Sequence, residues 1–89
     1  MFFYVYALES LSNKELYIGS TNNLIRRVKE HNLGKSPSTK RYRPWKLIYY
    51  EACIFEADAK RREYYLKTSQ GGRLLKRRLK EYFYSLRFA

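Results

Sequence analysis

Two tyrosines in β-like segments, an arginine in a helical pattern and a carboxylate further along the chain are side chains that together could hydrolyse a phosphodiester. Tyr6 lies in the first segment, Tyr17 opens the second, and Arg27 and Glu63 follow. A guanidinium can hold a phosphate and a carboxylate can hold a metal ion. A phenol can exchange a proton when a cation or base assists it, because its free pKa is near ~10.

Helical geometry separates Arg27 from its neighbour Arg26. Leu24 and Val28 mark the apolar stripe of the predicted helix, and Arg27 lies on its flank with His31, four residues later. Arg27 is therefore expected between core and surface, where a bound phosphate would meet a partly desolvated guanidinium. The shared flank makes His31 a candidate for assisting proton transfer.

Glu63 stands out because Ala59 and Leu66 bracket it on the apolar face of a second predicted helix. Buried carboxylates are rare unless they are paired or bound to metal. A single carboxylate leaves most of a divalent cation's shell to water and phosphate oxygens, which suits one Mg²⁺ or Mn²⁺ ion in phosphodiester chemistry.

These residues also have structural interpretations. Arg27 could form an ion pair with an acid across an interface, such as Glu63, while Arg26 and Glu30 form an exposed pair. The tyrosines could be ordinary strand aromatics. His31 is the only histidine, which excludes a multi-histidine metal site. A serine or cysteine nucleophile is not supported, because the chain has no glycine-flanked elbow serine.

Local patterns predict the elements that position these residues. The sequence predicts strands at 2–8, 15–19 and 45–54, and helices at 23–32, 56–68 and 73–86. Gly34 is expected to end the first helix, and Gly71-Gly72 to form the turn before the last one. The run 45–54 lacks clean alternation, which favours a central strand covered on both faces. The order β-β-α-β-α-α predicts an α/β chain of the α+β type, a small three-stranded sheet flanked by helices within a single domain over residues 1–89.

The last predicted helix is amphipathic. Its apolar face should dock on the body of the protein and leave a basic face outward. The residues of the apolar face are Leu75, Leu79, Tyr82, Phe83 and Leu86.

The chain is strongly basic, with a net charge of +11 over 89 residues. Residues 35–50 carry five basic and no acidic groups, and residues 70–89 carry six basic and one acidic. This clustering favours a nucleic acid as partner over an anionic membrane surface, and over a role in solubility alone. The candidate contacts form a loop patch (Lys35, Lys40, Arg41, Arg43) and a helix patch (Arg73, Lys76, Arg77, Lys80).

Cys53 is the only cysteine, so a disulfide within the chain is impossible and a reducing, cytoplasmic setting is expected. The apolar opening over residues 2–8 lacks a basic leader and stops at Glu9, which favours a strand over a signal peptide. No apolar run is long enough to cross a bilayer, and no membrane partner is predicted.

Five segments, taken in chain order, resemble the GIY-YIG nuclease superfamily. They are Tyr4-Val5-Tyr6, Tyr17-Ile18-Gly19-Ser20-Thr21, the arginines at 26–27, Glu30-His31-Asn32 and Glu63. The resemblance spans residues 4–67, and the basic tail is similar to that of small stand-alone bacterial members. It implies a three-stranded antiparallel sheet flanked by helices and hydrolysis of a phosphodiester with one divalent metal, Mg²⁺ or Mn²⁺. Relatives include the incision subunit of bacterial nucleotide-excision repair.

Carried over by position, the resemblance places Tyr6 and Tyr17 near the attacking water and Arg27 on the scissile phosphate. It makes Glu63 the metal ligand. His31 falls where some members have a histidine or tyrosine that assists proton transfer, and the general base is not assigned to one residue.

Three positions depart from the family pattern. Tyr4 stands where the first motif has glycine. Ser20 stands where the repair subunit has lysine, so one phosphate contact is missing or supplied elsewhere. No asparagine follows residue 32, although several relatives have one after the metal-binding glutamate. The last two departures bear on turnover more than on fold.

The sequence thus predicts a divalent-metal-dependent endonuclease acting on DNA, with RNA left open, in DNA repair or processing. Its specificity would come from DNA shape, single strands or a partner protein. Tyr42 and Trp45 could stack on exposed bases, although Trp45 suits the core equally well. The alternatives are a catalytically inactive or partner-dependent nucleic-acid-binding module and, behind it, a basic helix over 73–86 that docks on a membrane or a protein.

Overall fold

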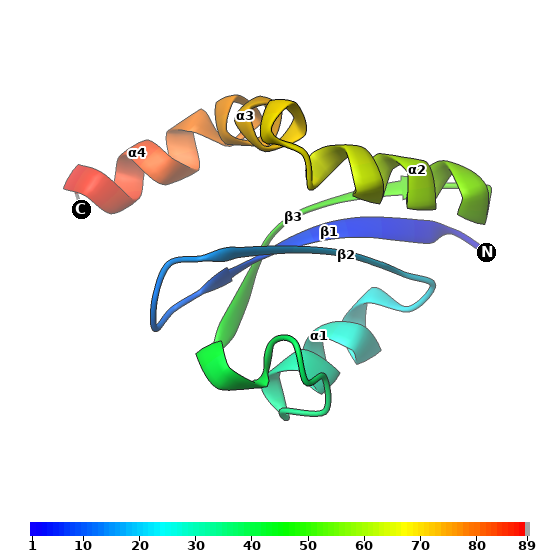
Figure 1. Cartoon of the computed structure of the whole chain (residues 1–89), viewed down its shortest axis with the longest axis horizontal. Coiled ribbons are helices and arrows are strands. Elements are labelled where there is room, and N and C mark those ends of the chain that lie inside the picture. Colours follow the sequence, from blue (N-terminus) through cyan, green and yellow to red (C-terminus); the bar gives the residue numbers. More distant parts are fainter. Residues whose placement is uncertain (89) are drawn as a thin grey trace.

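The computed structural model describes residues 1–88 and has a three-stranded antiparallel sheet with helices on both faces (Figure 1). No helix in that range has the length and apolar character needed to cross a bilayer. The predicted order is confirmed, except that the last helix is divided in two. The elements are β1 (Phe3–Ser10), β2 (Leu16–Thr21), α1 (Leu24–Asn32), a 3₁₀ turn (Lys40–Tyr42), β3 (Trp45–Cys53), α2 (Glu56–Leu66), α3 (Ser69–Arg78) and α4 (Lys80–Phe88).

The first strand, not the third, is the centre of the sheet. The strand order is β2-β1-β3, with both neighbours antiparallel to β1. Residues 5–10 of β1 are all buried, whereas most residues of β3 are half-buried or exposed. The prediction of a central strand over 45–54 was therefore wrong, because β3 is an edge strand. It pairs with β1 along one edge only, while α1 and α2 contact it from opposite faces of the sheet.

Side chains alternate along β1 between two cores. Val5 and Ala7 belong to the core shared with α2 and α3. Tyr6 and Leu8 belong to a second core that includes Trp45 and is packed against α1. Because neighbouring side chains in a strand point to opposite faces, Tyr6 lies on the α1 side of the sheet while α2 covers the other side.

Helix α1 begins and ends as its sequence predicts. The side chain of Asn23 accepts a hydrogen bond from the backbone N–H of Arg26 at 3.1 Å, which caps the first turn. Gly34, with φ +78°, follows the C-cap residue Leu33, and its N–H donates to the carbonyl of His31 at 3.2 Å. This left-handed position favours glycine, as the helix stop requires.

The predicted turn at Gly71-Gly72 was wrong, because both glycines lie in the first turn of α3. Thr68 caps that helix by accepting a hydrogen bond from the backbone N–H of Gly71. Gly71 is buried where α3 crosses the end of α2, and a methyl group there would collide with the carbonyl oxygen of Tyr65 and lie 2.8 Å from Cα of Leu66. The glycine serves this close approach of two backbones.

The break in the predicted helix over 73–86 instead lies at Leu79, between α3 and α4. Leu79 leaves the helical conformation, with φ −104° and ψ 28°, and α4 turns away from the axis of α3 (Figure 1). The apolar face still docks in part: Leu75 is buried and Leu79 packs against the core, whereas Leu86 is exposed. Tyr82 fixes α4 to the sheet by donating a 2.6 Å hydrogen bond to the buried Glu9 carboxylate.

The two glycines of α3 should respond oppositely to alanine. Gly71→Ala is expected to destabilise the fold by about 1–3 kcal/mol, because the added methyl group overpacks the α2–α3 crossing. Gly72→Ala is expected to stabilise it by about 0.5–1 kcal/mol, because helical alanine has less backbone entropy to lose and its methyl group would meet no described atom within 4 Å. Urea unfolding followed by circular dichroism measures both, and changes of the same sign would contradict this packing.

The two basic patches lie on opposite sides of the sheet. The loop patch lies beside α1, and the helix patch lies on α3 and the start of α4, beyond the other face (Figure 1). All of these side chains are exposed. A polyanion that contacted both patches would therefore have to pass around the edge of the sheet.

Candidate active site

The pairing of β1 with β2 gives the two tyrosine segments a steric relation to each other. Tyr6 is paired with Gly19 in the register, and a Cβ atom on Gly19 would lie 2.5 Å from the Tyr6 hydroxyl oxygen and 3.0 Å from the Tyr17 ring. The Tyr6 ring thus occupies the space of the missing side chain. The two tyrosine rings lie with their centroids 6.4 Å apart. Glycine at this position is what lets the Tyr6 hydroxyl reach β2.

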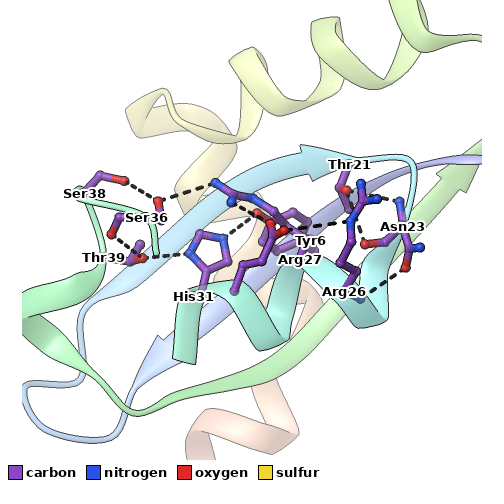
Figure 2. A network of polar contacts seen from close by, with 10 residues as sticks. Tyr6, Thr21, Asn23, Arg26, Arg27, His31, Ser36, Ser38 and Thr39 are labelled. Carbon is purple, nitrogen blue, oxygen red and sulfur yellow. Dashed lines mark hydrogen bonds and ion pairs between the residues drawn. The ribbon is translucent and has the colours of Figure 1, made fainter. Parts of the chain in front are cut away.

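The Tyr6 hydroxyl begins a chain of hydrogen bonds through His31 (Figure 2). Its oxygen lies 2.7 Å from Nε2 of His31, and Nδ1 of His31 lies 2.7 Å from the Thr39 hydroxyl oxygen. That hydroxyl donates to the carbonyl of Ser36 at 3.4 Å. Because a carbonyl can only accept, the Thr39 oxygen accepts from Nδ1–H and Nε2 accepts from Tyr6. The chain therefore directs the Tyr6 proton toward His31.

His31 is fully buried, which differs from the expected position on the helix flank. The segment after α1 folds back over it, and Ser36 and Thr39 are buried there as well. Burial, with the nearby Arg27 charge as a second cause, lowers the pKa of His31 to about 4. Burial, with Tyr17 as a second cause, raises the pKa of Tyr6 to about 12. Near neutral pH the imidazole is neutral and the phenol keeps its proton.

This buried histidine predicts a specific acid sensitivity. Its pKa is about 4 when folded and 6.5 in the reference state, so the unfolded chain binds more protons between these values. The stability linked to His31 is present above pH 6.5 and is lost as the pH falls toward 4. The full shift corresponds to about 3 kcal/mol. Urea unfolding at stepped pH should show this loss, and His31→Gln should remove it even if the variant is less stable. An equal slope in both proteins would contradict it.

Arg27 lies between core and surface, as the helical geometry predicts. Its side chain is 30% exposed, against 62% for Arg26. The two guanidinium nitrogens Nη1 and Nη2 donate to Glu30 at 3.1 Å and to the Ser36 hydroxyl at 3.4 Å (Figure 2). Burial lowers the pKa of Arg27, but the Glu30 carboxylate and Tyr6 outweigh it and leave that pKa raised. The guanidinium is therefore charged and held in place.

The ion pairs of α1 differ in one respect from the expected arrangement. Glu30 lies 3.9 Å from Arg26, which is the predicted pair, but it also binds Arg27 more closely. No ion pair joins Arg27 to Glu63 in the described part of the chain. The partner of Arg27 is thus a neighbour on its own helix, and Glu63 is left for other contacts.

Glu63 is partly buried on α2 and contacts β2 and its own helix. Its side chain is 17% exposed and accepts hydrogen bonds from the Ser20 hydroxyl at 2.6 Å and from Nζ of Lys67 at 2.8 Å. Nζ of Lys60 lies 3.9 Å from the same carboxylate. Burial raises the pKa of Glu63, but Lys67 and Ser20 outweigh it and leave that pKa lowered. The carboxylate is therefore ionised at neutral pH.

The two halves of the site meet at the end of β2. Tyr6 reaches Gly19 from the α1 side of the sheet, and the next residue, Ser20, donates to Glu63 from the α2 side. The Glu63 charge is close enough to contribute to the raised pKa of Tyr6. A phenol and a carboxylate thus reach one segment of β2 from its two faces, and the Arg27 charge lies near enough to Tyr6 to lower its pKa in part.

A family model for the GIY-YIG catalytic domain matches residues 2–76 of this chain. The chain belongs to the GIY-YIG family. Among its relatives, a UPF0213 protein of Clostridium perfringens is 45% identical over 65 residues, which cover 72% of this chain and 69% of that protein. A structure-specific endonuclease subunit SLX1 homolog of Giardia intestinalis is 43% identical over 47 residues, or 49% of this chain and 13% of that protein.

Solved structures were matched as well. The solution NMR structure of a UPF0213 protein from Bacillus halodurans is 37% identical, with 97% of this chain and 85% of that chain covered, and the TM-score is 0.47.

In this GIY-YIG chain the donor set around Glu63 fits a single hard divalent cation. Within residues 1–88, no three His, Cys, Asp or Glu side chains gather into a group that could hold a metal. Glu63 is nevertheless ionised and partly accessible, and Lys67, one of its two hydrogen-bonded partners, is half exposed. One carboxylate completed by water and phosphate oxygens is an arrangement that Mg²⁺ accepts.

Several features of this GIY-YIG site were not predicted. Ser20 was noted only as the replacement of a lysine, whereas its hydroxyl binds Glu63. Thr39 completes the His31 chain, and only its place in a segment with buried polar residues could have signalled this. Trp45 is buried and its indole N–H donates to the carbonyl of Thr39 at 2.8 Å, so it is a core residue and not a stacking surface. Tyr42 remains partly exposed beside Arg41.

Proposed function

We propose that this chain is a divalent-metal-dependent endonuclease that hydrolyses phosphodiester bonds in DNA. The observation that carries the proposal is that the Tyr6 hydroxyl reaches Gly19, the next residue Ser20 binds Glu63, and the Arg27 charge acts on Tyr6. Each side chain is held by partners that leave it in the charge state the chemistry needs. Membership of the GIY-YIG family supports the same reaction class.

Arg27 would bind the scissile phosphate and stabilise the charge that grows on it. Its guanidinium is charged, partly desolvated and held by Glu30 and Ser36, so little reorganisation is needed when an anion arrives. Its planar fork matches two phosphate oxygens.

Glu63 would hold one Mg²⁺ or Mn²⁺ ion, and Lys67 would release the carboxylate when it does so. A divalent ion bound there would polarise the phosphate and stabilise the leaving oxygen. Ser20 keeps the carboxylate oriented throughout, because its hydroxyl donates to the oxygen that Lys67 does not contact. This is a positioning role for the residue that stands where the repair subunit has lysine.

Tyr6 and His31 would form the proton path, with Tyr17 beside them. Because Tyr6 donates to Nε2, its oxygen can take a proton from water as its own proton passes to the neutral imidazole. The hydrogen bond from Nδ1 to Thr39 fixes the tautomer that receives it. Tyr17 is more exposed than Tyr6 and would border the attacking water.

We further propose that recognition depends on the structure of the DNA rather than on its sequence. Exposed basic side chains on both sides of the sheet suit contacts with phosphates, which carry no sequence information. The relative named as a structure-specific endonuclease subunit supports this preference, and the word subunit supports action with a partner protein. The role that we propose is in DNA repair or processing.

The deciding experiment incubates the purified protein with single-stranded, duplex, branched and flapped DNA, with Mg²⁺, with Mn²⁺ and with chelator. Cleavage of at least one substrate that requires metal is expected, and Glu63→Gln prepared in the same way controls for contaminating nuclease. Cleavage that survives in this variant would remove the assigned site. Salt-sensitive binding with no cleavage of any substrate would instead favour a nucleic-acid-binding module.

A further inference from the structure

A groove lies along the outer edge of β2, between that strand and the three C-terminal helices. Its volume is about 1040 Å³. The end of α2, the first turns of α3 and one face of α4 form its other walls. Among the described strands β2 pairs only with β1, and Leu16, Tyr17 and Ile18 of β2 line the groove.

The groove is continuous with the candidate active site. Tyr17 and Lys67 both line it. Nζ of Lys67 lies 2.8 Å from the Glu63 carboxylate, and the Tyr17 ring neighbours that of Tyr6. The groove therefore borders two residues that contact the site, Lys67 beside Glu63 and Tyr17 beside Tyr6.

The lining combines lysines with apolar side chains. Lys14, Lys67 and Lys76 contribute positive charge. Two acids, Glu9 and Glu15, also line the groove, so the lysines outnumber the acids by three to two. Glu9 is 2% exposed and accepts the hydrogen bond from Tyr82. The groove therefore has an excess of positive charge. Apolar contact surface comes from Leu16, Phe83 and Leu86.

Gly72 lines the groove at a position where the fold does not need a glycine. A Cβ atom there would meet no described atom within 4 Å, in contrast to Gly71 next to it. Gly72 also lies in a helix, where glycine is less favourable than alanine. Because Gly72 has no side chain, an occupant of the groove has room to approach the backbone of α3 closely.

We propose that this groove holds a single-stranded nucleic-acid segment that leads to the scissile phosphate. The inference deepens the proposed function and rests on it. Lysines would contact the phosphates of such a segment, and the apolar walls would contact its unstacked bases. A duplex offers mainly phosphates and sugars to a groove of this kind, so the apolar walls favour the single strand. The excess of lysine favours a polyanion over a second copy of this +11 chain.

Substitution of Gly72 tests this without altering the core. Gly72→Gln places a neutral side chain in the groove, and Gly72→Glu places a charged one of nearly the same size. Both variants should fold, because the position is open. The probes are a fluorescent 20-nucleotide oligothymidylate and a hairpin duplex with the same number of phosphates, measured by anisotropy in chelator. Chelator prevents metal-dependent cleavage during the measurement.

The single-stranded probe should bind roughly tenfold more weakly to Gly72→Glu, because one base contact and the local charge are both lost. Gly72→Gln should show a loss of about threefold, and the duplex should change by less than about twofold in either variant. Unchanged single-strand affinity in folded Gly72→Glu would overturn the proposal, as would an equal loss for the duplex. The proposal would also be overturned if the native chain is a dimer that dissociates in Gly72→Glu, because the occupant of the groove would then be a second copy of the chain.

Binding and cleavage fail separately in this design. If the protein cuts DNA but substitution of Gly72 does not change its affinity for single strands, the groove assignment is contradicted and the nuclease proposal stands. If substitution of Gly72 weakens single-strand binding but the native protein cuts no substrate in the presence of metal, the groove assignment is supported and the nuclease proposal is contradicted.

Discussion

Replacing Glu63 with glutamine is expected to reduce metal-dependent cleavage about a thousandfold while the protein stays folded. The amide keeps the shape of the side chain and can still accept from Ser20, but it lacks the charge that a divalent cation needs. Loss of the metal's stabilisation of the transition state is worth several kcal/mol, and each 1.36 kcal/mol is a factor of ten in rate. The Lys67 ion pair is half exposed, so its loss should cost less than about 1 kcal/mol of stability.

Single-turnover cleavage and direct titration of Mn²⁺ measure the two consequences of this change. Glu56→Gln is the matched control, because it neutralises an exposed carboxylate in the first turn of the same helix. It should cleave and bind Mn²⁺ like the native chain. Full cleavage by Glu63→Gln, or weakened Mn²⁺ binding in both variants alike, would contradict the role of Glu63 as the metal ligand.

The sequence predicted the elements that local chemistry determines. The Asn23 cap and Gly34 bound α1 because both act within one turn of the helix, and periodicity separates Arg27 from Arg26 for the same reason. Glu63 was also identified locally, from its place between Ala59 and Leu66. In each case the deciding contacts lie within a few residues along the chain.

The features that were missed depend on contacts between distant segments. His31 is buried because residues 36–39 fold back over α1, and no pattern within the helix indicates this. The edge position of β3 follows from β1 inserting between the other two strands, a choice that strand composition does not encode. Gly71 looked like a turn because the crossing of α2 and α3 that requires it exists only in three dimensions.

Gly19 shows how a motif can be recognised before its physical reason is available. The spacing of the two tyrosine segments identified the family, but only the register places Tyr6 opposite Gly19. The register explains why residue 19 is glycine: the Tyr6 hydroxyl occupies the space that a side chain at position 19 would need. The same register places Ser20 where it can orient Glu63.

Arg27→Ala is expected to lower cleavage by about a hundredfold to a thousandfold, the effect of removing one preorganised donor to a developing negative charge. The native fold should lose little, because the ion pair with Glu30 is about one-third exposed on each side and such pairs contribute ~0–1 kcal/mol. Binding of DNA should weaken only slightly, since many basic side chains share the phosphate contacts. The expected result is thus a selective loss of rate, measured as single-turnover cleavage beside DNA affinity and thermal unfolding.

Arg26→Ala supplies the matched control, because Arg26 has the same side chain and shares Glu30 but is 62% exposed and lies 3.9 Å from that acid. It should retain nearly full cleavage. Arg27→Lys should fall between the native chain and Arg27→Ala, because lysine keeps the charge and loses the planar fork that matches two phosphate oxygens. Equal losses in Arg26→Ala and Arg27→Ala would mean that the helix contributes only general positive charge. A drop in DNA affinity as large as the drop in rate would assign Arg27 to substrate binding instead of transition-state stabilisation, because an interaction made equally in both states does not raise the rate of the chemical step.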